Sequence, residues 1–242
     1  CFEVEARLRE LLDIPVFHDD QHGTAIVVLA ALRNSLKLVK KNLGDVKIVM
    51  SGAGAAGTAI ARLLVLSGAK HIIAFDKDGV ICKSSSGEGD MRRWFIDNSN
   101  HENFQGDIHQ AMAGADVFIG VSAPNVVSES DVESMAKDSI VFALANPDPE
   151  IDPVLARKQA AVVATGRSDQ PNQINNVLAF PGIFRGLLDA GASKITDELL
   201  VACADAIASC VSEQQLNASF IVPSVFDPNV VKAVADAVKR CC

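Results

Sequence analysis

The segment "PVFHDDQHGTA" (residues 15–25) gathers side chains that could do chemistry at the start of an apolar stretch. Asp19 and Asp20 are adjacent, and His18 and His22 bracket them. Neighbouring carboxylates repel each other, so the pair costs stability unless a cation or a reaction uses it. In one interpretation Asp20 binds a hard divalent ion such as Mg²⁺ or Mn²⁺, and Asp19 takes part in proton transfer or orients the ligands. One carboxylate is too few for a metal, so the other ligands must come from elsewhere.

Two other interpretations of this segment remain open. His18 and His22 have the spacing of an H-E-x-x-H zinc site, but Asp19 stands in place of the glutamate and the segment begins a helix instead of lying inside one. Both differences disfavour zinc. Aspartates also cap helix N-termini, but a cap needs one aspartate and not two.

A glycine-rich turn follows an apolar run in "IVMSGAGAAGTAIARLL". Gly52, Gly54 and Gly57 have G-x-G-x-x-G spacing between a predicted strand and a predicted helix, which is the context of a dinucleotide-binding turn. Gly52 permits the tight turn, Gly54 lets the backbone approach a pyrophosphate, and Gly57 allows close packing of helix on strand. The helix N-terminus, with Ala55 and Ala56, offers free N–H groups to the anion. The alternative is a glycine turn that binds nothing.

Asp76 lies nineteen residues past Gly57, at the end of the predicted strand "HIIAFD". An acidic residue at that distance binds the ribose hydroxyls of a dinucleotide. Asp76 favours NAD because a carboxylate repels a 2′-phosphate, although the adjacent Lys77 leaves NADP open.

Polar residues follow three further predicted strands, where ligands of such sheets bind. We expect Ser122, in "VSAPN", to contact the cofactor. Asn146, in "ANPDPE", is placed to donate an amide N–H to a substrate oxygen, and Asn176 follows Asn175 before the apolar "VLAFPGIF". The alternative for any one asparagine is a turn that satisfies its own backbone.

Apolar runs and helical periodicity alternate along the chain. Strands are predicted over 46–52, 71–76, 115–124, 139–147 and 160–166, and helices over 2–12, 25–41, 57–69, 90–96, 128–136, 184–190, 196–211 and 229–239. The stretch 79–100 is otherwise irregular. This alternation predicts an α/β fold with a doubly wound, Rossmann-like parallel sheet and flanking N- and C-terminal helices.

Composition excludes several classes of protein. The formal net charge is −8 and the basic residues are scattered, which argues against a nucleic-acid partner. No apolar stretch is long enough to span a membrane, and the N-terminus does not read as a signal peptide. The six cysteines form no CxxC pair, so we expect a reducing, cytoplasmic location.

Four segments together, "IPVFHDDQHGTA", "GAGAAGTAIA", "ANPDPEI" and "TGRSDQPNQINNVLAFPGIFRG", resemble the C-terminal, NAD(P)-binding half of a bacterial malic enzyme. The resemblance implies oxidative decarboxylation of L-malate to pyruvate and CO2, with NAD(P)⁺ and Mg²⁺ or Mn²⁺, by a homo-oligomer. It implies that Asp20 is a metal ligand, that Asp19 belongs to the catalytic network, and that Asn146 and Asn176 contact the substrate. The two histidines are not carried over as ligands, and we expect them to be structural.

The chain departs from the family pattern at one point. Family members use a tyrosine and a lysine of an N-terminal domain, with a Glu-Asp pair of metal ligands, whereas this chain has no tyrosine and begins in helical periodicity without Met. We therefore expect a dinucleotide-binding domain over 1–242 without the N-terminal catalytic domain. Its expected parts are a helical segment with the Asp pair (1–43), a Rossmann core (44–180) and C-terminal helices (181–242). A malolactic enzyme, an amino-acid dehydrogenase domain that needs no metal, and a catalytically silent dinucleotide-binding module remain alternatives.

Overall fold

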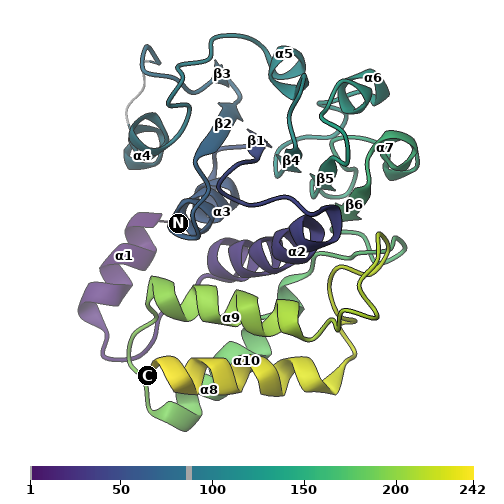
Figure 1. Cartoon of the computed structure of the whole chain (residues 1–242). Helices are drawn as coiled ribbons and strands as arrows, with labels where there is room; N and C mark the ends of the chain where they lie inside the picture. Colours follow the sequence, from purple (N-terminus) through teal and green to yellow (C-terminus); the bar gives the residue numbers. More distant parts are fainter. Residues whose placement is uncertain (1, 86–88) are drawn as a thin grey trace.

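The computed structural model describes residues 2–85 and 89–242, and its centre is a six-stranded sheet (Figure 1). The strand order is β3-β2-β1-β4-β5-β6. The strands are β1 (Lys47–Ser51), β2 (His71–Asp76), β3 (Gly79–Val80), β4 (Val117–Gly120), β5 (Ile140–Ala143) and β6 (Val162–Thr165). All neighbours pair in parallel except β3, which pairs antiparallel with β2 at the edge. From β1 the chain adds β2 and β3 on one side of β1, and it then returns to add β4, β5 and β6 on the other side. The direction of strand addition therefore changes between β1 and β4. Doubly wound α/β sheets bind their ligands at this point.

Helices cover both faces of this sheet. They are α1 (Phe2–Leu11), α2 (Thr24–Val39), α3 (Ala55–Leu66), α4 (Asp90–Asn98), α5 (Ile108–Met112), α6 (Glu129–Glu133), α7 (Pro153–Gln159), α8 (Phe180–Ala190), α9 (Asp197–Ser209) and α10 (Pro228–Cys241), with the short turns η1 (Asp19–Gly23) and η2 (Asn176–Leu178). Alternate residues of β5 show the two-sided burial: Ile140 and Phe142 belong to the hydrophobic cluster with α2 and α3, and Val141 and Ala143 to the cluster with α5, α6 and α7. Burial on both faces explains why the strands read as continuous apolar runs.

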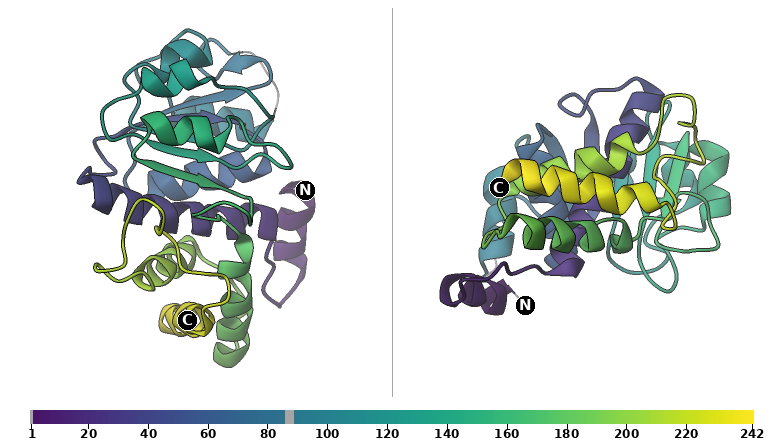
Figure 2. Two further views of the ribbon diagram at one scale, coloured as in Figure 1. Left: turned by 90° about the vertical axis from the view of Figure 1, so that its right-hand side faces the viewer. Right: turned by 90° about the horizontal axis from the view of Figure 1, so that it is seen from below.

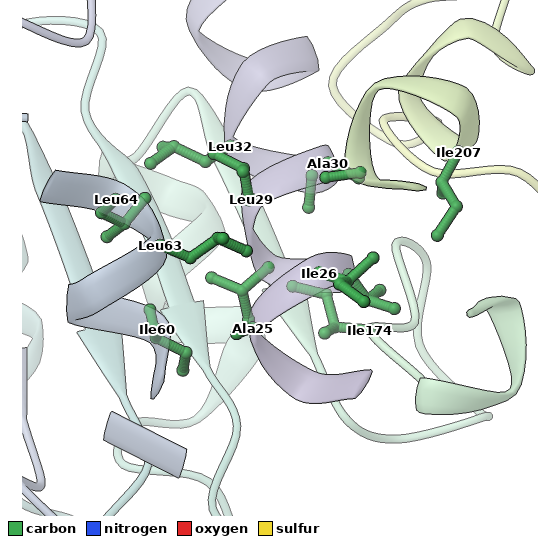
Figure 3. Close-up of a cluster of buried hydrophobic side chains, with 14 of the residues drawn as sticks. Ala25, Ile26, Leu29, Ala30, Leu32, Ile60, Leu63, Leu64, Ile174 and Ile207 are labelled. Carbon is green, nitrogen blue, oxygen red and sulfur yellow. The ribbon is translucent and has the colours of Figure 1, made fainter. Parts of the chain in front are cut away.

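Helix α2 forms a buried middle layer between the sheet and a further layer of α8, α9 and α10 (Figures 1 and 2). Ala25 to Leu32 are all buried, and Figure 3 shows this helix between side chains of α3, such as Leu63, and Ile207 of α9. The Asn34 side chain fixes the layers by donating to the carbonyls of Ala208 and Ile221, at 3.0 and 2.9 Å. None of the helices in the described part of the chain has the length and apolar character needed to cross a membrane.

The structure confirms the α/β prediction and refines several boundaries. The predicted helix over 57–69 begins earlier, at Ala55, and the one over 184–190 begins at Phe180. Strand β3 and helices α5 and α7 were not predicted; β3 has only two residues, too few to show a period. Within the predicted irregular stretch 79–100, residues 86–88 lie outside the described residues. The division at 43 and 180 stays a prediction, since α2 shares one hydrophobic cluster with the strands and α9.

Candidate active site at the carboxyl ends of the strands

Two cavities lie side by side at the carboxyl ends of the parallel strands, and Ser122 lines both. The larger, of about 720 Å³, is bounded by the glycine turn and Asp76. The smaller, of about 480 Å³, is bounded by the Asp19–Asp20 pair, Asn146 and Asn176. The site predicted from separate sequence segments is therefore brought to one edge of the sheet.

The glycine turn between β1 and α3 leaves room for an anion. A Cβ on Gly52, whose φ is +106°, would lie 2.6 Å from the carbonyl oxygen of Val121, and a Cβ on Gly57 would overlap the carbonyl oxygen of Gly52. A Cβ on Gly54, in contrast, would meet no atom within 4 Å. No side chain caps α3, so N–H groups of its first turn have no side-chain acceptor beside this open space. These features fit the pyrophosphate of a dinucleotide.

The far end of the larger cavity carries a charged pair. Asp76, at the end of β2, forms an ion pair with Arg92 of α4, and both side chains are largely buried. Asp76 Oδ1 also accepts the backbone N–H of Asp78 at 2.9 Å. The carboxylate expected to bind ribose hydroxyls is thus held in place by a guanidinium that the sequence analysis did not predict.

Asp19 and Asn176 meet in the smaller cavity. Asn176 Nδ2 donates to Asp19 Oδ2 and to the Asp19 backbone oxygen, both at 3.2 Å, and Thr24 Oγ1 donates to Asn176 Oδ1 at 3.1 Å. Asp19 Oδ1 is buried and finds no hydrogen-bond partner in the described part of the chain. Burial raises the pKa of Asp19, and the hydrogen bond from Asn176 only partly opposes this shift.

The Asp pair lies in η1, a five-residue π-helical turn that runs directly into α2. Such turns add a residue to the helical ladder and are frequent at functional sites. Asp20 lines the smaller cavity with Asp19. No cluster of three metal-binding side chains occurs among residues 2–85 and 89–242. Magnesium, however, is often held by one or two protein carboxylates together with substrate oxygens, so Asp20 and the unpartnered Asp19 oxygen fit part of such a set.

His22 is engaged inside the protein instead of facing the smaller cavity. Its Nδ1 accepts the His18 backbone N–H at 3.2 Å, and its Nε2 lies 3.2 Å from Glu5 Oε1 of α1. Burial, followed by the charges of Arg9 and His18, lowers the pKa of His22 to about 4. The ring therefore works as a neutral structural link between η1 and α1.

Glu150 is fully buried between the ends of β4 and β5. Its Oε1 accepts the backbone N–H of Ser122 at 2.8 Å, and its Oε2 accepts the backbone N–H of Ala145 at 3.0 Å. Burial raises the pKa of Glu150, while hydrogen bonds from these two amides favour the ionised form.

Residues 21–242 match the family described as the NAD-binding domain of malic enzyme. The chain belongs to the malic enzyme family. It is 54% identical over 238 residues to an NAD-dependent malic enzyme of Geobacillus stearothermophilus, a match that covers 98% of this chain and 50% of that protein. It is 50% identical over 242 residues to a bifunctional malic/malolactic enzyme of Bacillus subtilis, covering 99% of this chain and 59% of that protein.

The fold agrees with a solved malic enzyme. The crystal structure of the NAD-dependent malic enzyme from Thermotoga maritima superposes with a TM-score of 0.93 at 44% identity, covering 99% of this chain and 63% of that one. The chain therefore spans between 50% and 63% of the length of these three malic enzymes.

The predicted site residues of this malic enzyme chain divide between the two cavities. The smaller contains Asp19, Asp20, Ala56, Asn146 and Asn176, the larger contains Gly52, Gly54 and Asp76, and Ser122 lines both. Ala55 and Gly57 line neither cavity: Ala55 begins α3, and Gly57 packs against the turn. Their roles stay predictions.

Thr24, Arg92 and Glu150 are among the residues at the site that were not predicted. Thr24 lies within the segment "PVFHDDQHGTA" that contains the Asp pair, and Glu150 lies in the polar strand end "ANPDPE" that was singled out for Asn146. An acidic residue shortly after a predicted strand could have marked Glu150 as a candidate site residue from the sequence alone. Arg92 follows Asp76 by sixteen residues in the predicted helix over 90–96, and no local pattern marks it as a partner of Asp76.

Proposed function

We propose that this chain is the dinucleotide-binding part of an enzyme that oxidatively decarboxylates L-malate to pyruvate and CO2 with NAD⁺ and Mg²⁺ or Mn²⁺. The observation that carries the proposal is the contact between Asp19 and Asn176, 157 positions apart in the chain, in a cavity that shares Ser122 with the glycine-lined cavity. A structural helix cap does not need a second aspartate or a half-buried asparagine donor from a distant segment.

The polar site residues predicted from the sequence that line the smaller cavity each have a proposed part. When bound, the dinucleotide accepts a hydride from malate and the divalent ion polarises the oxygen on the reacting carbon. Asp20 holds the ion. The side-chain amides of Asn146 and Asn176 orient the substrate by donating N–H groups to its oxygens. Asp19 fixes Asn176 and belongs to the proton-transfer network, and Ser122 lies where nicotinamide and substrate meet.

We infer a preference for NAD over NADP from Asp76. A carboxylate at the end of β2 accepts hydrogen bonds from ribose hydroxyls and repels a 2′-phosphate. Its ion pair with Arg92 occupies the guanidinium that would otherwise be free to bind that phosphate.

Calorimetry tests the proposal on the chain itself. NAD⁺ is titrated first, and Mn²⁺ is then titrated with NAD⁺ present, on the native chain and on Asp20→Ala. We expect NAD⁺ to bind both forms and Mn²⁺ to bind the native chain more tightly. Equal Mn²⁺ affinity in the two forms would support the catalytically silent module, in which the Asp pair only caps a helix. Absence of NAD⁺ binding by a folded chain would refute the proposal as a whole.

The reaction is tested in a chimaera that places the remaining half of the Geobacillus relative before this chain. Malic enzyme activity predicts that NADH accumulates as malate is consumed. Conversion of malate to lactate without net NADH would instead favour the malolactic alternative, which the name of the Bacillus relative makes the second candidate. Metal-independent turnover of an amino acid would favour an amino-acid dehydrogenase.

We also propose that the protein is a cytoplasmic homo-oligomer. Free thiols at Cys82, Cys203 and Cys210 suit a reducing compartment. Exposed apolar side chains on α8, such as Phe184 and Leu188, suit burial against another subunit. Light scattering of the purified protein tests the assembly.

A further inference from the structure

Glu150 links two loops of the site, the one that follows β4 and the one that follows β5. We propose that Glu150 is a positioning residue that holds Ser122 and Asn146, from neighbouring strand ends, at the spacing the cofactor and substrate need. The inference rests on the proposed function, because it takes the two cavities to be the cofactor and substrate sites.

The side chain connects the two loops through their backbone. Ser122 and Ala145 are the second residues after the ends of β4 and β5, and each donates its N–H to a different oxygen of the same carboxylate. Ser122 lines both cavities, and Ala145 directly precedes Asn146. A shift of Glu150 would therefore move a residue of the cofactor cavity and a residue of the substrate cavity together.

Backbone hydrogen bonds extend this connection. The N–H of Val127 donates to the Glu150 carbonyl, and the N–H of Asn125 donates to the Pro149 carbonyl, both at 3.2 Å. The Ser122 hydroxyl adds a contact of 2.7 Å to Ser51 at the end of β1. The ends of β1, β4 and β5 thus form one connected unit around a single carboxylate.

The sheet leaves space for this carboxylate at Gly120. A Cβ at Gly120, the last residue of β4, would lie 2.6 Å from Glu150 Oε1, so only glycine fits below the carboxyl group. A charge with no exposure to water is costly, and burial raises the pKa of Glu150. If the side chain at position 150 only filled space, an apolar residue would do so without the cost of burying a charge.

The need for two acceptors explains why a carboxylate is used. Two backbone N–H groups point at Glu150, and a carboxylate can accept both. Glutamine has the same size but offers one accepting oxygen and one N–H₂ group, which would face an N–H donor. Glu150→Gln therefore removes one of the two links and keeps the volume.

The test combines exchange and binding measurements on the native chain, Glu150→Gln and the control Glu133→Gln, which makes the same change at an exposed position of α6. Without ligand, we expect hydrogen exchange at the Ser122 or Ala145 amide to accelerate at least roughly tenfold in Glu150→Gln only. We expect NAD⁺ affinity to fall roughly tenfold or more in the same variant, as for other small displacements of a binding group. Unchanged exchange and unchanged NAD⁺ affinity would overturn the inference.

Two further readouts separate the possible failures. If the native chain does not bind NAD⁺, the proposed function fails, while the exchange rates still decide whether Glu150 ties the loops. If Glu150→Gln does not fold, NMR on the native chain tests the inference instead. In a pH titration, the amide resonances of Ser122 and Ala145 should shift with the same midpoint as the carboxyl carbon of Glu150. Addition of NAD⁺ should shift both amide resonances. Independent titrations of the two amides, or no shift with NAD⁺, would overturn the inference.

Discussion

Alanine at Gly54 and alanine at Gly57 add the same methyl group to one turn, yet the structure predicts different outcomes. At Gly57 the new Cβ overlaps the carbonyl oxygen of Gly52, whose own N–H is fixed to the Phe75 carbonyl at 2.8 Å. Overpacking of this kind costs about 1–3 kcal/mol. Because the overlap is with a backbone oxygen, which cannot rotate away, we take a cost of about 2–3 kcal/mol. Alanine in a helix returns about 0.5–1 kcal/mol relative to glycine, so we expect a net loss of about 1–2.5 kcal/mol.

At Gly54 the added methyl group meets no atom within 4 Å, and the backbone, with φ of −79°, suits alanine. Its unfolding free energy should stay within about 0.5 kcal/mol of the native value. The methyl group does project into the space proposed for the pyrophosphate. NAD⁺ affinity should therefore fall at least roughly tenfold, which is about 1.4 kcal/mol of binding free energy.

Thermal unfolding and NAD⁺ calorimetry on the two variants check both parts. The melting temperature should fall by about 2–10 °C for Gly57→Ala and change little for Gly54→Ala. Gly54→Ala should bind NAD⁺ weakly. Native NAD⁺ affinity in Gly54→Ala would refute the assignment of the open space to the cofactor. Equal loss of stability in the two variants would refute the distinction between packing and binding glycines.

Three further changes test other parts of the structure. Asp76→Asn should weaken NAD⁺ binding roughly tenfold and narrow its advantage over NADP⁺; an unchanged ratio in parallel titrations would contradict the ribose role. Asn176→Ala leaves the half-buried Asp19 carboxylate without its donor and should lower the unfolding free energy in urea by about 0.5–1.5 kcal/mol. Burial opposes ionisation of Asp131, but hydrogen bonds from Ser128 outweigh it and lower the pKa of Asp131 below its ordinary 3.8. Its stabilisation is present above 3.8 and is lost as pH falls through the folded-state pKa, so the stability deficit of Asp131→Asn, measured in urea, should shrink below about pH 4.

Features that depend on local sequence could be predicted. The turn from β1 to α3 and Asp76 after β2 follow from the spacing of glycines and an acid around apolar runs, and the structure places them at one cavity. The antiparallel edge strand β3 could not be predicted, because two residues carry no period.

Features that depend on distant contacts could not be predicted in the same way. The hydrogen bond from Asn176 to Asp19 spans 157 positions, and only the resemblance to a family indicated a shared site. Arg92 reaches Asp76 because α4 returns along the edge of the sheet, a geometry that no residue pattern encodes. The catalytic, metal and substrate roles of the site residues stay predictions.

The middle position of α2 has a consequence for how the chain folds. This helix is made well before α9, the helix that covers its far side and lies much later in the chain. Until α9 is available, the apolar surface of α2 from Ala25 to Leu32 has no cover on that side. The core therefore closes only after a long-range contact forms, which slows folding and exposes the nascent chain to aggregation.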